Sequence, residues 1–188
     1  MVKQELTRCT WGNNSDELYR NYHDHEWGKL NLDEKYLYEM LVLESFQSGL
    51  TWATILHKRE NFRQAFAGFD VEKVAQFTQA DFEQLMQNSG IIRNRLKIRA
   101  AINNAQVLVK WHQADKTFRD FLLKYIPQPL DNHYQKMSDV PASTPLSTKV
   151  SKAMKQEGFK FVGPVTVYSF LQAVGLVNDH LANCQFRN

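Results

Sequence analysis

The chain has 188 residues, of which 43% are hydrophobic and 23% charged, and its formal net charge is +3. This length and composition support one buried core and exclude several independent domains, so we expect a single domain over residues 1–188, which can consist of two helical lobes. No apolar run is long enough to cross a bilayer or to act as a signal peptide. The sequence therefore predicts a cytoplasmic protein with no membrane partner.

Helical periodicity and N-cap residues predict a succession of helices. Asn14 and Glu17 have the spacing of a capping box before the first helix. In chain order the expected helices cover residues 16–25, 33–46, 51–66, 71–77, 81–88, 95–113, 118–126, 148–157 and 165–174. The segment from Pro127 to Thr148 has no periodicity and is predicted to be an extended surface loop. Because no segment alternates with a period of two, the expected fold class is all-α.

Two clusters of basic residues stand out against the modest net charge. They are Arg93, Arg95, Lys97 and Arg99 in one case, and Lys149, Lys152, Lys155 and Lys160 in the other. Each cluster has the charge to face DNA phosphates, but a solvated helix face gives the same pattern. The pattern alone leaves both interpretations open.

Glu44 interrupts an apolar helix face. It follows Leu37, Met40 and Leu41 at helical spacing, on the stripe that should face the core. An unpaired buried carboxylate is costly or takes up a proton, so it needs a partner. Glu44 is therefore either a site residue or a glutamate that forms a salt bridge or reaches solvent at the helix end.

Five aromatic residues flank the segment that carries Glu44, namely Trp11, Tyr19, Tyr22, Trp27 and Trp52. Tyr19 and Tyr22 are three residues apart and share one helix face. Such flat side chains usually belong to a core. Beside a buried acid, they are also what an extruded nucleobase requires for stacking.

The two cysteines, Cys9 and Cys184, lie almost at opposite ends of the chain. A reducing cytosol disfavours a disulfide, so they are free thiols or metal ligands. His180 and Cys184 are four residues apart, one turn of a predicted helix, and Cys9 with His23 can supply a second pair. Together they would form a closed zinc site, although the spacing of Cys9 and His23 is not that of a compact zinc finger.

Six separated stretches resemble one family, the bacterial 3-methyladenine DNA glycosylase I enzymes of the helix-hairpin-helix superfamily. They are residues 8–11 (RCTW), 18–28 (LYRNYHDHEWG), 43–52 (LESFQSGLTW), 90–95 (GIIRNR), 158–163 (GFKFVG) and 175–180 (GLVNDH). They occur in order across nearly the whole chain. Six matched stretches are far more specific than any single motif.

The resemblance implies a helix-hairpin-helix glycosylase fold in which one structural zinc ion joins the N- and C-terminal segments. Its ligands would be Cys9, His23, His180 and Cys184. The resemblance also implies that a flipped base is held by catalytic Glu44 and by the aromatic residues Tyr19, Tyr22, Trp52, Trp11 and Trp27. The implied fold thus combines a base pocket with a metal centre.

For DNA binding, the resemblance implies that residues 158–174 contain a hairpin and a helix N-terminus whose amides hold a phosphate. Lys160 and Gly163 belong to this segment. We expect the turn with Gln47, Gly49 and Leu50 to fill the gap that the flipped base leaves.

The implied activity is removal of 3-methyladenine from alkylated double-stranded DNA, by a protein expected to be a monomer. The attached lesion is already cationic and leaves without a general acid, so Glu44 would recognise its charge. Where other superfamily members carry a catalytic aspartate, this chain has Asn178, next to Asp179. No lysine in the pocket stretches stands out as a Schiff-base nucleophile, which predicts a monofunctional enzyme.

Thr10, Ser45 and Phe46 depart from residues common in the family, and Phe46 would alter the pocket rim or the wedge. The alternative function is therefore a protein that keeps the zinc site and binds damaged DNA without cleaving it. A zinc-dependent hydrolase is a third hypothesis, which is weaker because four protein ligands leave the metal no open position.

Overall fold

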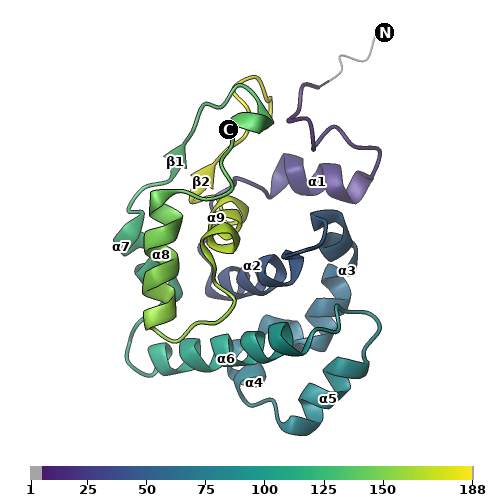
Figure 1. Ribbon diagram of the computed structural model, residues 1–188, viewed down its shortest axis with the longest axis vertical. Helices are drawn as coiled ribbons and strands as arrows, with labels where there is room; N and C mark the ends of the chain where they lie inside the picture. The colour runs from purple at the N-terminus through teal and green to yellow at the C-terminus, as the bar shows by residue number, and fades with distance from the viewer. Residues whose placement is uncertain (1–5, 188) are drawn as a thin grey trace.

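The computed structural model describes residues 6–187 and is mostly helical there, which confirms the all-α expectation (Figure 1). Its α-helices are α1 (Glu17–His25), α2 (Glu34–Gln47), α3 (Trp52–Ala65), α4 (Val71–Ala75), α5 (Gln79–Gln87), α6 (Arg95–His112), α7 (Phe118–Tyr125), α8 (Pro145–Gln156) and α9 (Pro164–Ala173). The 3-10 helices η1 (Ala67–Phe69) and η2 (Met137–Asp139) and the strands β1 (Leu130–Asp131) and β2 (Val177–Asn178) complete this part of the chain. None of its helices has the length and apolar character needed to cross a bilayer.

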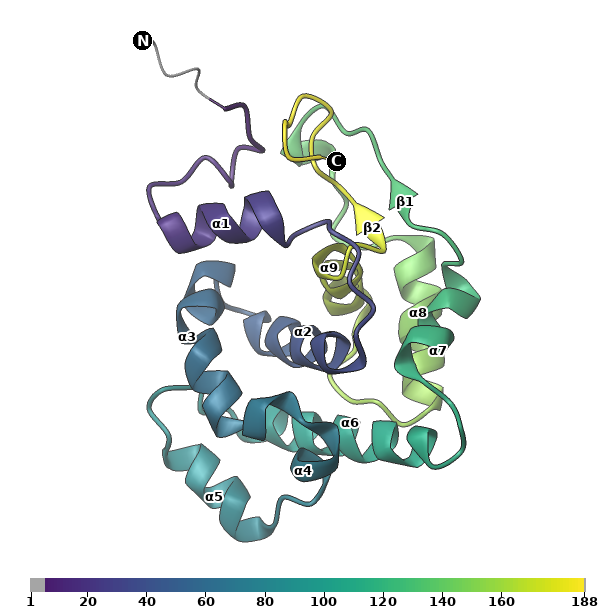
Figure 2. The same cartoon turned by 180° about the vertical axis from the view of Figure 1, so that it is seen from behind.

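The centre of the molecule is α2, where every residue from Leu37 to Phe46 is buried. A helix that is buried all round must be covered by neighbours on every side. Figures 1 and 2 show α2 beside α9 in the interior, with α1 and α3 on one side, α6 along another, and α7 and α8 on a third. This arrangement places the C-terminal end of α2 close to α3 and α6.

The longest described helix, α6, packs against α4 and α2. Its buried residues Ile98, Ala101, Ala105 and Leu108 recur at intervals of three and four, the period of one helix face. Asn94 caps its first turn through its side chain, which accepts from the amides of residues 96 and 97. The sequence pattern therefore located this helix to within one residue.

The cap of α1 differs from the expected capping box. The Asp16 carboxylate, and not Asn14, accepts from the amides of Leu18 and Tyr19. Asn14 instead accepts from the amide of Asp16. Asp16 directly precedes the first helical residue, so its side chain reaches the free amides of the first turn, which Asn14 does not.

The segment predicted as one extended loop contains β1, η2 and the first turn of α8. Thr144 caps α8 with a capping box to Ser147, and Pro145 occupies the first turn, so the helix begins before the expected Thr148. Leu130 pairs in parallel with Val177, although no alternating pattern in the sequence indicated a strand. The two strands have two residues each, too short to show alternation in sequence.

Candidate active site

A pocket of about 370 Å³ opens between α1, the C-terminal half of α2, the start of α3, the η2 segment and α9. It is lined by Trp11, Tyr19, Tyr22, Trp27, Glu44, Gln47, Trp52, Met137, Val140, Pro141, Ala142, Val165, Tyr168, Ser169 and Gln172. The structure thus brings Glu44 and all five aromatic residues of the sequence hypothesis into one cavity. Its size is typical of small-molecule sites.

Glu44 lies in this pocket with a buried side chain, and no hydrogen-bond or ion-pair partner is found for its carboxylate among the described residues. Burial raises the pKa of Glu44 from its ordinary value of 4.5 to about 8. The other buried acid of α2, Glu39, has two arginine partners, with Arg59 at 2.6 Å and Arg63 at 2.9 Å. Two buried acids of one helix thus differ: arginines neutralise Glu39, and no cation of the described structure neutralises Glu44.

Tyr22 and Trp52 stand next to each other in the pocket, with ring centroids 5.1 Å apart. The Tyr22 hydroxyl and the Trp52 Nε1 are buried and have no hydrogen-bond partner among residues 6–187. Buried polar atoms nearly always have a partner, so two such donors beside an unpaired carboxylate indicate a site for a polar guest. Desolvation, reinforced by Glu44, raises the pKa of Tyr22 well above its usual range, so its hydroxyl remains a donor.

Trp11 connects the pocket aromatics to each other. Its ring meets Tyr19 edge-on at 5.3 Å and Trp27 edge-on at 4.9 Å. Trp27 is only 8% exposed, so its ring is held in place by the residues around it. These contacts give the pocket a preformed aromatic wall.

The η2 segment and α9 supply pocket walls that the sequence did not predict. Val165, Ser169 and Gln172 follow one face of α9, at spacings of four and three residues. The polar residues on this otherwise apolar helix were a usable signal. Nothing in the sequence pattern marked Met137 or Pro141, because the segment that carries them has no periodicity.

Asp179 does not line the pocket. It is fully buried, and its carboxylate accepts from the Tyr168 hydroxyl (2.6 Å), the Gln172 amide (2.6 Å) and the Asn132 amide (2.7 Å). Asn178 is also engaged elsewhere, since its Nδ2 donates to the Arg187 carbonyl. Asp179 therefore orients two pocket side chains and does not itself reach the pocket.

A candidate metal centre lies behind the aromatic wall. The ligand atoms of Cys9, His23, His180 and Cys184 are buried and lie within 4.8 Å of one another. The His180 Nδ1 is 3.5 Å from the Cys9 sulfur and 3.3 Å from the Cys184 sulfur, and the His23 Nε2 is 3.8 Å from the Cys184 sulfur. Sulfur and nitrogen ligands on one tetrahedral zinc ion are about 3.5 Å apart, so this donor set fits.

In each histidine, the ring nitrogen that points away from the cluster has a hydrogen-bond partner, which orients the ring as a metal ligand. The His23 Nδ1 contacts Asp24 at 2.7 Å, and Asp24 is held in turn by Arg8. The His180 Nε2 contacts the Trp27 carbonyl at 2.9 Å. Each ring can then direct an unprotonated nitrogen at the cluster, as metal-binding histidines do. Burial raises the pKa of Cys9 to about 12, so a cation is needed to hold its thiolate.

His180 and Cys184 do not converge along a helix, and the expectation from their spacing is wrong. They lie after β2, in a segment of turns and irregular backbone, and not on a helix. The amide of Leu181 donates to the Cys9 sulfur at 3.3 Å, and the amide of Cys184 bonds the carbonyl of Leu181 at 2.8 Å. A tight turn therefore brings the two ligands together.

The turn at residues 47–50 follows α2 at the mouth of the pocket. The Gln47 side chain donates to the Leu50 carbonyl at 2.9 Å, and the Leu50 amide donates to the Gln47 carbonyl at 2.7 Å. Gly49 has a φ of +84°, which disfavours residues with a side chain there. Leu50 is 39% exposed, so the turn presents an apolar side chain to solvent.

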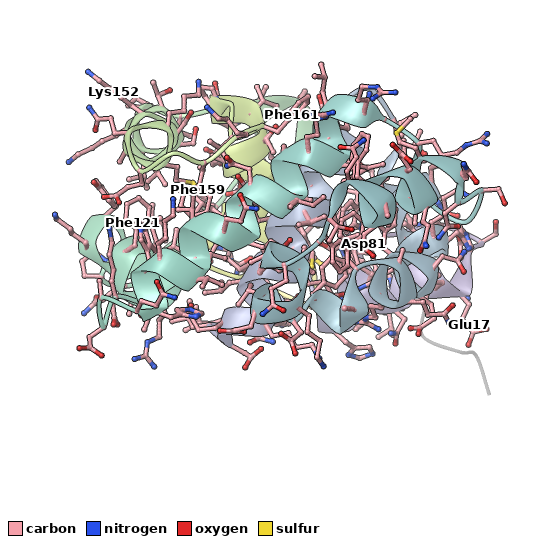
Figure 3. All side chains as sticks on the ribbon, turned by 90° about the horizontal axis from the view of Figure 1, so that it is seen from below. Glu17, Asp81, Phe121, Lys152, Phe159 and Phe161 are labelled. Carbon is pink, nitrogen blue, oxygen red and sulfur yellow. The ribbon has the colours of Figure 1, made fainter. Side chains whose placement is uncertain are left out.

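The segment at residues 158–163 joins α8 to α9. Phe159 points into the interior and Phe161 lies at the surface, on the same side of the molecule as Lys152 (Figure 3). Lys160 is exposed, and Gly163 is the N-cap of α9 without a side-chain cap bond. No N-cap side chain therefore accepts a hydrogen bond from the first amides of α9.

The basic clusters divide between surface and interior. Most members are exposed, namely Arg93, Arg95, Arg99, Lys149, Lys152, Lys155 and Lys160. Lys97 is buried, and its Nζ donates to two backbone carbonyls, so it is not available to a phosphate. Neither a phosphate contact nor a solvated helix face describes Lys97, because this position of α6 faces α2 and the turn that follows it.

Comparison with known proteins agrees with this geometry. The family model described as Methyladenine glycosylase matches residues 11–188. The DNA-3-methyladenine glycosylase 1 of Escherichia coli is 47% identical over 180 residues, which cover 95% of this chain and 96% of that protein. The DNA-3-methyladenine glycosylase of Haemophilus influenzae is 42% identical over 179 residues, with 95% and 96% covered.

Solved structures give the same result. The structure of a 3-methyladenine DNA glycosylase I variant in complex with 3-methyladenine matches with a TM-score of 0.92 at 43% identity, and the match covers 97% of this chain and 98% of that one. With sequence and structure matching over nearly their full length, this chain belongs to the methyladenine glycosylase family.

Proposed function

We propose that this protein is a DNA-3-methyladenine glycosylase that hydrolyses the bond between 3-methyladenine and deoxyribose in alkylated double-stranded DNA. The observation that carries the proposal is the unpaired, buried carboxylate of Glu44 in an aromatic pocket. The relatives of this chain bear the name of that activity, and one of them is solved with 3-methyladenine bound. Membership of the family favours this function over non-catalytic binding of damaged DNA.

The proposed selectivity rests on charge. Methylation at N3 makes the attached adenine cationic, and this cation can meet the Glu44 carboxylate, whereas neutral adenine cannot form the same ion pair. Aromatic faces add cation–π attraction of about 0.5 to 2 kcal/mol each, and Trp52 and Tyr22 are placed to supply it. Their free donor atoms can bond the ring nitrogens of the guest.

The cationic base is a good leaving group, so the mechanism needs little further assistance. Glu44 recognises the lesion and stabilises the charge, and it does not act as a general acid. In the part of the chain that the structure describes, no lysine lines the pocket, which supports a monofunctional enzyme that forms no Schiff base. Asp179 is occupied by three donors, which supports a positioning role for it and not activation of water.

The metal in the proposal is a single structural zinc ion held by Cys9, His23, His180 and Cys184. A complete set of four protein ligands leaves no position for substrate, so the ion would supply stability and no chemistry. By joining the segment before α1 to the segment after β2, it would hold Trp11 and Trp27 against the pocket.

Two segments of the chain contact DNA in the proposed complex. The 158–163 segment and the N-terminal amides of α9 form the phosphate-binding hairpin, with Lys160 and Gly163 as members. The turn with Gln47, Gly49 and Leu50 enters the duplex where the base has left. We propose a monomer that acts in the cytoplasm, where bacterial DNA lies.

The test of the function is incubation of the protein with methylated duplex DNA, followed by chromatography of the released bases. Release of 3-methyladenine, with no cleavage of the DNA backbone by the protein alone, is expected. Binding to methylated DNA without release would support the non-catalytic alternative and contradict the proposal.

Replacing Arg95 and Lys160 by glutamine tests the proposed footprint. Affinity for undamaged duplex should fall, and the slope of log affinity against log salt should decrease by about one for each lost phosphate contact. Lys110, which is exposed near the other end of α6, provides the matched control when it is replaced by glutamine. An unchanged slope in the double variant would place the footprint elsewhere.

A further inference from the structure

Lys97 is the buried cation of α6, and it is bound by backbone carbonyls alone. Its Nζ donates to the Phe46 carbonyl at 2.9 Å and to the Ser48 carbonyl at 2.6 Å, and within residues 6–187 it has no carboxylate partner. These carbonyls belong to the end of α2 and to the 47–50 turn. A cation at a helix C-terminus interacts favourably with the helix dipole, and here it also ties the turn to α6.

Asn104 performs a parallel task at the 158–163 segment. It is 1% exposed, its Oδ1 accepts from the Lys160 amide at 2.8 Å, and its Nδ2 donates to the Lys160 carbonyl at 3.0 Å. Asn103 adds a bond to the Gly158 carbonyl at 2.9 Å. Phe161 has a φ of +55°, a strained conformation for a residue with a side chain, so this segment needs such bonds to keep its shape.

Lys97 and Asn104, which we call the α6 pair, are seven residues apart. Seven residues are two turns of helix, so both side chains lie on one face of α6, about 10 Å apart along its axis. Figure 1 shows α6 along one side of the molecule, with the connection from α8 to α9 passing close to it. Ser45 adds a direct link, since its hydroxyl contacts the Phe161 carbonyl at 3.2 Å.

We propose that the α6 pair consists of positioning residues that hold the 47–50 turn and the 158–163 segment at a constant separation, so that both engage one duplex together. The inference rests on the proposed function, which gives these two segments their contacts with DNA. The 158–163 segment holds a phosphate and the 47–50 turn enters the gap that the base leaves. One duplex fixes the distance between these two places, so a shift of about 1 Å between the two segments weakens their simultaneous engagement.

The test replaces Lys97 by methionine and Asn104 by leucine, which keep the volume and remove the bonds, with Lys110→Met as the control on the exposed side of α6. Both variants should release 3-methyladenine from methylated duplex at least about tenfold more slowly than the control in single-turnover experiments. The Kd for free 3-methyladenine, measured by titration, should stay within about twofold of the wild-type value, because neither residue lines the pocket.

A mutant cycle with Leu50→Ala adds a readout that a merely structural role would not change. If Lys97 acts through the 47–50 turn, the effects of Lys97→Met and Leu50→Ala on release should be less than additive. Full additivity, release equal to that of the Lys110 control, or an equal loss of free-base binding would each overturn the inference. Failure of the proposed function itself would be recognised separately, as absence of release by the wild-type protein.

Discussion

Replacing Glu44 by glutamine is expected to slow single-turnover release of 3-methyladenine from methylated duplex by about ten- to a hundredfold, or roughly 1.4 to 2.8 kcal/mol. Glutamine keeps the shape and one acceptor oxygen but loses the charge that meets the cationic base. The carboxylate has no other partner in the described structure, so its burial is compensated only when the lesion binds. Affinity for the free base should fall in the same variant.

The pH dependence provides a second measurement on Glu44. Burial raises its pKa to about 8, so in the free enzyme the carboxylate takes up a proton as the pH falls below about 8. The kcat/KM of the wild type should then decrease by up to about tenfold per pH unit below that value, and Glu44→Gln should lack this dependence.

The same pKa predicts the sign of a stability change. Because the folded pKa exceeds the ordinary value of 4.5, the folded state binds the proton more tightly than the unfolded state does. Wild-type stability should therefore decline as the pH rises from about 4.5 to about 8, and Glu44→Gln should decline less. Thermal unfolding at several pH values measures both proteins.

Trp52→Ala tests whether the carboxylate and the stacking surface act on one bound base. It should impair release and free-base binding, and its combination with Glu44→Gln should be less than additive. Release at the wild-type rate by the glutamine variant would exclude recognition of charge by Glu44 and leave it a structural part of α2.

Replacing Cys184 by serine is expected to lower bound zinc and the Tm together, the latter by about 10 °C or more. The cluster joins Cys9 to His180 across 171 positions of the chain, so losing the metal frees both terminal segments from the core. In the variant, the buried side chains of Cys9, His23 and His180 would also lose the metal that they bind. Elemental analysis and thermal unfolding of the same preparation check the two changes.

Chelation of the wild-type protein separates a structural metal from a catalytic one. A structural ion should be removed only as the protein loses stability, and activity should decline with the folded fraction. Full zinc content in the Cys184→Ser protein would contradict the assignment of ligands. Immediate loss of activity in a fully folded, metal-free protein would instead indicate a metal that takes part in the reaction.

The helices and the chemically unusual residues were largely predictable. Helix signals are local, because capping bonds and the i to i+4 ladder involve neighbours in sequence, and the boundaries of α2, α3 and α6 follow the N-caps Asp33, Thr51 and Asn94. Glu44 was visible as a carboxylate on an apolar stripe. Cys9 and Cys184 were informative because the chain has no other cysteine.

Other parts of the site had no local signal. The η2 segment reaches the pocket with Met137 and Pro141, although its residues form no repeating pattern. The strand pairing of Leu130 with Val177 involves two residues on each side, fewer than an alternating pattern needs. The positions of these segments depend on parts of the chain that are far away in sequence: β1 pairs with β2, and the η2 segment lines the pocket together with α9.

The sequence by itself determined where the helices lie along the chain, which residues bear chemistry, and which family they resemble, because these depend on residue types and short spacings. Only the tertiary structure decided which charges are paired. Glu39 and Glu44 lie five positions apart on the same buried helix, yet two arginines of α3 reach Glu39 and none reaches Glu44 in the described structure. Lys97 belongs to a basic run in sequence, yet it faces carbonyls of α2 and the following turn and not solvent. The energy of a buried charge depends on groups that the fold brings within a few ångströms, and no local pattern contains that information.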